Sequence, residues 1–130
     1  MDAFGHLNNA RIFTYFEEAR IRMLEDHAGD WTGEAGPVVV HAACTYKRPI
    51  VHPATLVVHL GTDAPSRTSF NTRYVVSTEE QPHVVHAFGE ARMVWVTVAS
   101  GRPTRLPQLF SDLYQDGQER PDVFGVFADR

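Results

Sequence analysis

The residues best suited to chemistry stand at the start of the sequence, where an acid, a glycine and a histidine precede a helix-forming stretch. They are Asp2, Gly5 and His6, followed by Asn8 and Asn9. A carboxylate can attack a carbonyl or activate a water molecule, and the first N–H groups of a helix lack intrahelical partners and favour negative charge. Aspartate is also common before helices as a turn or capping residue. The residue types alone leave a catalytic and a structural interpretation open.

An amphipathic helix of about five turns is predicted from Asn8 to about His27, because apolar residues recur there at steps of three and four. These apolar residues are Ile12, Phe13, Phe16, Ala19, Met23 and Leu24. Asn8 or Asn9 can cap the start of the helix, and Gly5 permits a tight turn before it. The predicted helix therefore presents its N-terminal end to the acid-containing segment.

After Pro37 the apolar pattern changes to a period of two, which is typical of β-strands. Four strands are predicted, at 38–46, 55–62, 68–78 and 83–99, and the short connections favour an antiparallel meander. A short helix is expected at 108–115, and the rest of the segment 110–130 is expected to be irregular. The predicted fold class is α+β, with the long helix on one face of the sheet and a partner subunit on the other.

The composition restricts the possible partners and compartments. A length of 130 residues with 43% hydrophobic residues indicates one domain over 1–130. A net charge of -4 offers no large basic surface for nucleic acid. Cys44 is the only cysteine, so no intrachain disulfide can form, and the sequence shows no signal peptide and no membrane span. A cytoplasmic protein is expected.

No metal or cofactor is expected from the sequence. It contains seven histidines, of which the closest pair, His83 and His86, would point to opposite faces of a strand. No cysteine or carboxylate shares a ligand spacing with them. Neither a glycine-rich phosphate loop nor a Gly-x-Ser-x-Gly elbow is present.

The opening string resembles a known active-site motif. It reads Asp2-Ala-Phe-Gly5-His6-Leu-Asn8-Asn9, followed by Phe13 and Tyr15-Phe16-Glu17-Glu18-Ala19-Arg20. This pattern is similar to the active-site loop and central helix of the 4-hydroxybenzoyl-CoA thioesterase-like family of hotdog proteins. A weaker similarity continues in Ser69-Phe70 and in the segment 101–107.

The resemblance implies a hotdog fold, in which a curved antiparallel sheet wraps a long central helix. Members of that family usually carry an edge strand before the aspartate, often ending in Asp-x-Asp. Here Met1 stands where the residue between the two acids would be, so we expect the N-terminal edge strand to be missing.

The function implied by the resemblance is hydrolysis of an acyl-CoA thioester, with water as co-substrate. Asp2 would act as general base or nucleophile, and the backbone N–H of Asn9 would polarise the thioester carbonyl. His6 would either act as an acid or base or shape the loop. The site would lie at the subunit interface of a homodimer or homotetramer.

Further residues are expected to contact the substrate, as loop, cation or acyl-pocket residues. They are Gly5, Asn8, Phe16, Arg48, Arg67, Ser69 and Phe70. Arginines at strand ends could bind the phosphates of coenzyme A. Two alternatives remain open on the same fold: an enoyl-CoA hydratase-type enzyme, and a non-catalytic acyl-CoA-binding module.

Overall fold

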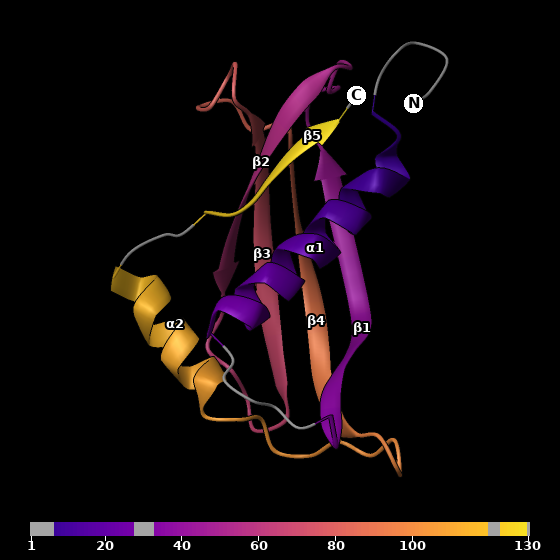
Figure 1. Cartoon of the computed structure of the whole chain (residues 1–130), viewed down its shortest axis with the longest axis vertical. Coiled ribbons are helices and arrows are strands. Elements are labelled where there is room, and N and C mark those ends of the chain that lie inside the picture. The colour runs from indigo at the N-terminus through magenta and orange to yellow at the C-terminus, as the bar shows by residue number, and fades with distance from the viewer. Residues whose placement is uncertain (1–6, 28–32, 120–122, 130) are drawn as a thin grey trace.

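The helix predicted at the start of the chain is present and lies across an antiparallel sheet (Figure 1). The structure, a computed structural model, describes residues 7–27, 33–119 and 123–129. Its elements follow in the order α1 (Asn9–His27), β1 (Ala35–Tyr46), β2 (Ala54–Thr62), β3 (Ser69–Thr78), β4 (Ala87–Thr97), α2 (Leu109–Glu119) and β5 (Val123–Asp129). The expectation of a missing edge strand before Asp2 concerns residues outside the described ranges.

The sheet has the strand order β1-β4-β3-β2-β5, and every neighbouring pair is antiparallel, so the predicted α+β class is confirmed. The predicted meander is correct for β2, β3 and β4 and wrong for β1, which pairs with β4. The connection after Tyr46 contains Pro49 and Pro53 and forms no tight hairpin with β2. Instead, the N–H groups of Lys47 and Arg48 both donate to the carbonyl oxygen of His86, at 2.9 and 3.0 Å.

The prediction of an irregular C-terminal segment is wrong, because β5 pairs with β2 at the edge of the sheet. The short helix expected there extends to Glu119 as α2. The ring of Phe127 packs against Tyr15 of α1 with centroids 5.0 Å apart, and the guanidinium of Arg22 lies 4.6 Å above it. These contacts with α1 stabilise a strand that the local sequence alone does not indicate.

Both helices pack on the same face of the sheet. Phe16 of α1 stacks on Tyr74 of β3, and Phe110 of α2 packs against Phe70 of β3 and Trp95 of β4. The inward positions of β2, β3 and β4 follow the period of two and are almost fully buried. On the other face, which carries the half-exposed side chains of Val75 and Phe88, the described part of the chain provides no helix.

Candidate active site

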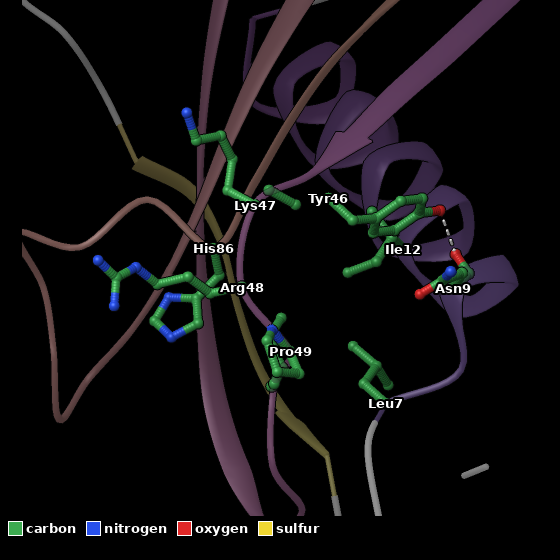
Figure 2. A pocket seen from close by; sticks show the side chains of 10 residues that line it. Leu7, Asn9, Ile12, Tyr46, Lys47, Arg48, Pro49 and His86 are labelled. Atoms are coloured by element: carbon green, nitrogen blue, oxygen red, sulfur yellow. Dashed lines mark hydrogen bonds between the residues drawn. The ribbon is translucent and has the colours of Figure 1, made fainter.

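A cavity of about 300 Å³ lies where the start of α1 meets the end of β1 and the start of β4 (Figure 2). Ten residues from these elements and from the connections beside them line it. They are Leu7, Asn9, Ile12, Tyr46, Lys47, Arg48, Pro49, Ile50, His86 and Ala87. The volume is at the lower end of the range typical of small-ligand sites.

Backbone hydrogen bonds fix the segments that form this cavity. The N–H of Leu7 donates to the carbonyl oxygen of Ile50 at 2.8 Å, which ties the entry to α1 to the connection between β1 and β2. The two bonds from Lys47 and Arg48 to His86 tie that connection to β4. The cavity therefore has walls from three separate parts of the chain that are joined to one another directly.

The backbone N–H of Asn9, at the start of α1, has no acceptor among the described residues. The side-chain oxygen of Asn8 accepts the N–H of Ala10 at 2.9 Å, and the carbonyl oxygen of Asn8 accepts the N–H of Arg11 at 3.0 Å. Among the described residues no acceptor contacts the N–H of Asn9. A first-turn N–H of this kind carries the positive end of the helix dipole and can stabilise an oxyanion.

Cationic side chains lie across the cavity from the helix start. The charged ends of Lys47 and Arg48 extend to the side opposite Asn9 and Tyr46 (Figure 2). The ten described residues that line the cavity include no aspartate or glutamate. The described wall therefore combines an apolar surface from Leu7 and Ile12 with positive charge at the rim, which suits a ligand with an apolar end and an anionic end.

Tyr46 and Cys44 are neighbours on β1 and influence each other's ionisation. Burial raises the pKa of Tyr46 to about 12, and the adjacent Cys44 adds to this effect. Burial also raises the pKa of the Cys44 thiol, which a hydrogen bond with Tyr46 partly offsets. The Tyr46 hydroxyl therefore stays protonated, and able to donate, throughout the neutral pH range.

Some of the sequence-predicted site residues come together in this cavity. Asn9 and Arg48 line it, and Asn8 caps the helix directly beside it. The predictions for Asp2, Gly5 and His6 lie outside the described residues. These three precede Leu7, whose position at the cavity wall is fixed.

Other predicted residues lie elsewhere. Phe16 and Phe70 are buried in the core, and Ser69 is buried with its hydroxyl bonded to Ser66 and Arg92. Arg67 lines a second hollow of about 520 Å³. This hollow lies between the β2–β3 connection and the segment that leads into α2. Arg105 lines the same hollow, and its neighbour Leu106 donates its N–H to the Arg67 carbonyl oxygen at 2.9 Å.

Sequence reasoning did not assign Tyr46 and His86 to the site. Both sit at strand ends, and they meet only because β1 pairs with β4, which the predicted meander did not include. His86 is buried, and its Nδ1 atom lies 3.2 Å from the carbonyl oxygen of Val84. The available signal was the basic pair Lys47-Arg48 directly after Tyr46, because connections that follow a strand often carry binding residues.

Within the described ranges, no group of three or more histidine, cysteine, aspartate or glutamate residues is placed to hold a metal ion. Neither α1 nor α2, the helices of the described part of the chain, has the length and apolar character that a membrane span requires.

Comparison of this chain with known proteins points to the same kind of protein as the fold and the cavity. Residues 1–114 match the family model described as the thioesterase-like superfamily. The chain belongs to the thioesterase-like superfamily. The antiparallel five-stranded sheet with two helices is consistent with a hotdog-like thioesterase fold.

Several solved structures are similar to this chain along most of its length. The PA2801 protein of Pseudomonas aeruginosa is 36% identical with a TM-score of 0.77, covering 86% of this chain and 87% of that one. A Thermus thermophilus thioesterase complexed with coenzyme A and Zn is 30% identical with a TM-score of 0.73, covering 88% of each chain. A 1,4-dihydroxy-2-naphthoyl-CoA thioesterase from Synechocystis, 20% identical with a TM-score of 0.78 over 89% of this chain and 88% of that one, shares the fold.

Proposed function

We propose that this chain hydrolyses acyl-CoA thioesters at the cavity beside the start of α1. The observation that carries the proposal is the N–H of Asn9, for which the described residues supply no acceptor at the wall of the cavity. A thioester carbonyl bound there gains a donor for the negative charge that grows on its oxygen during attack by water. Family membership supports thioester hydrolysis as the reaction class.

Asp2 is the proposed base or nucleophile. Leu7 is held at the cavity wall by its bond to Ile50, and Asp2 precedes it by five residues. Five residues span at most about 17 Å, so the carboxylate stays within reach of the cavity. His6 stands directly before Leu7 and would either orient Asp2 or move a proton itself.

Coenzyme A is the proposed carrier because two cationic side chains at the rim of the cavity can bind its phosphates. Lys47 and Arg48 extend from the rim of the cavity, away from the Asn9 end. The similar Thermus thermophilus thioesterase was solved with coenzyme A. An acyl thioester at Asn9 would then extend its anionic portion toward these two side chains.

A homodimer through β1 is the proposed assembly. One edge of β1 pairs with β4, and no strand of the described chain pairs with its other edge. Val38, Val39 and Val40 on this strand are each about half exposed. Antiparallel pairing of β1 with β1 of a second copy would bury these three side chains. In such a dimer, the sheet end of one copy that carries Arg67 and Arg105 would lie at the same end as the cavity of the other copy.

The deciding experiment measures release of free thiol from short, long and aromatic acyl-CoA esters. Wild type should hydrolyse at least one of them, and Asp2→Asn should reduce kcat on it at least about a hundredfold, as expected for loss of a catalytic base. A wild type inert across the panel, or an Asp2→Asn variant as active as wild type, would contradict the proposal. A parallel assay for hydratase activity measures the addition of water to an enoyl-CoA through the loss of the absorbance of the enoyl thioester.

A matched pair of variants at position 9 tests the oxyanion donor separately. Asn9→Pro removes the backbone N–H at the first helical position, where proline is well tolerated, and the residue before it already has a capping conformation. Asn9→Ala removes only the side chain. We expect Asn9→Pro to lower kcat about a hundredfold or more and Asn9→Ala to retain most of it. Equal activity of the two variants would contradict the role of this N–H.

The carrier is tested by comparing an acyl-CoA with the same acyl group on N-acetylcysteamine, which lacks the phosphates. Wild type should have a KM lower by about tenfold or more for the CoA ester, because charge-assisted bonds to phosphate contribute about 1.5–3 kcal/mol each. Lys47→Gln with Arg48→Gln should remove much of that difference while leaving the KM of the short ester unchanged. Glu79 and Glu80 lie on another turn, and Glu79→Gln with Glu80→Gln provides a control for altered charge elsewhere.

A further inference from the structure

Tyr46 reaches from the last position of β1 to the first residue of α1. Its hydroxyl donates a hydrogen bond of 2.7 Å to the carbonyl oxygen of Asn9, across a separation of 37 residues (Figure 2). Its ring also lines the cavity. This bond connects the start of α1 to the sheet.

This bond acts on a peptide group that is held at both ends. The Asn9 carbonyl and the Ala10 N–H belong to the same planar unit. Tyr46 binds the carbonyl at 2.7 Å, while the Asn8 side chain accepts the N–H at 2.9 Å. Because both polar groups of this peptide unit are bonded, its plane is fixed. The adjoining Cα and backbone N–H of Asn9 therefore have little freedom to rotate.

We propose that Tyr46 is a positioning residue for the oxyanion donor: through its bond to the Asn9 carbonyl it holds the start of α1 so that the Asn9 N–H faces the substrate carbonyl. This inference rests on the thioesterase function proposed above. It deepens that function by assigning to β1 the task of aligning the donor that α1 carries.

Backbone pairing and hydrogen bonds hold the end of β1, and with it Tyr46, in place. Tyr46 pairs with Ala87 of β4, and the next two N–H groups, of Lys47 and Arg48, are both bonded to His86. The pKa of Tyr46, raised to about 12 by burial and by Cys44, keeps the hydroxyl protonated at neutral pH. The hydroxyl can therefore donate to the Asn9 carbonyl oxygen at neutral pH.

Tyr46→Phe removes the hydroxyl and keeps the ring, so it tests the bond alone. We expect kcat to fall on the order of tenfold, with KM changed less than twofold, because misplacement of a catalytic donor affects the transition state more than substrate binding. Tyr114→Phe removes the same atom from α2 and should leave both constants at wild-type values. A wild-type kcat in Tyr46→Phe would overturn the proposal while leaving the thioesterase function intact.

A double-mutant cycle with Asn8 tests whether the two side chains hold the same unit. Asn8→Ala should lower kcat, Asn8→Asp should restore most of it because aspartate caps equally well, and the combination of Tyr46→Phe with Asn8→Ala should be non-additive. Strict additivity of the two losses would overturn the proposal, since independent effects imply no shared peptide group.

Amide hydrogen exchange of the full chain provides a readout that needs no activity. Tyr46→Phe should raise the exchange rate of the Ala10 amide about tenfold, whereas Tyr114→Phe should not, because local opening of the helix start becomes easier. Unchanged protection of Ala10 in Tyr46→Phe would overturn the proposed clamp whether or not the protein hydrolyses thioesters. An inert wild type would overturn the thioesterase function and with it the catalytic purpose of the clamp.

Discussion

The ring of Phe16 on α1 lies stacked on the ring of Tyr74 on β3, with centroids 4.2 Å apart and planes inclined by 10°. Both side chains are almost fully buried, and the Tyr74 hydroxyl accepts a hydrogen bond of 3.0 Å from Arg20 one turn further along the helix. This pair fixes the height and the rotation of α1 on the sheet. The position of the helix start at the cavity depends on that placement.

Gly89 makes room for this stack. It pairs with Tyr74 on one side and with Cys44 on the other. A Cβ atom added at this position would come within 2.6 Å of Phe16 Cε2 and would clash with the Ala43 carbonyl oxygen. Because that oxygen belongs to the backbone, it cannot move aside easily. The glycine is therefore required by the closeness of both the β1 backbone and the Phe16 ring of α1.

The first prediction is that Gly89→Ala destabilises the fold by about 1–3 kcal/mol, the usual cost of overpacking. The measurement is urea unfolding followed by circular dichroism. Gly61→Ala on β2 is the matched control, since an added Cβ there meets nothing within 4 Å, and its stability should equal or slightly exceed that of wild type. Equal stability of the two variants would contradict the account of Gly89.

The second prediction concerns β5. Phe127→Ala should destabilise the protein by about 3 kcal/mol, because it removes a buried ring from Tyr15 and Arg22. Val126→Ala, at the preceding position of the strand with its side chain half exposed, should change stability by no more than about 0.5 kcal/mol. Thermal unfolding of both variants checks this. A negligible effect of Phe127→Ala would mean that β5 contributes little to the fold in solution.

The sequence predicted the elements that have a clear internal period. The helix from Asn8 to about His27 agrees with α1 to within a residue, and the strands predicted at 55–62 and 68–78 agree with β2 and β3 to within a residue. The sequence did not predict β5. This strand is stabilised by contacts between Phe127 and α1, and the local sequence pattern does not indicate such long-range contacts. It also did not place β1 beside β4, because short connections favour but do not impose adjacent strands.

The site was predictable to the extent that it is contiguous in sequence. Asn8 and Asn9 were identified because helix starts have characteristic residues, and Asn8 does cap the helix. Tyr46 and His86 are separated by forty positions and meet only through the pairing of β1 with β4. Aromatic residues such as Phe16 and Phe70 fit a core and an acyl pocket equally well by type, and the structure places both in the core.

The third prediction uses Cys44, the only cysteine of the chain. Burial raises the pKa of its thiol, so the thiolate fraction at pH 8 is smaller than that of an ordinary cysteine. Alkylation by iodoacetamide, followed by mass spectrometry, should therefore be slower in the native protein than in urea. The native rate should continue to rise as the pH passes above the ordinary value of 9.0. A native rate that levels off below that pH would contradict the direction of the shift.

The fourth prediction tests assembly through β1. Val40 has an exposed fraction of 56% and lies at the irregularity between Val39 and His41, where the pairing with β4 shifts by one residue. Val40→Lys replaces a side chain that is exposed to solvent in the single chain by a charged one. The free energy of unfolding of the monomer should therefore change by no more than about 0.5 kcal/mol. Pairing of two copies through this edge would bury that charge and place it near its symmetry mate.

Light scattering after size exclusion should therefore find wild type at twice the chain mass or more, and Val40→Lys shifted toward a single chain at the same concentration. Val126→Lys on β5, with a side chain 50% exposed at the opposite edge of the sheet, is the matched control and should keep the wild-type mass. If Val126→Lys dissociates the assembly and Val40→Lys does not, the copies associate through β5. In that case, pairing through β1 does not bring Arg67 and Arg105 of one copy to the cavity of the other.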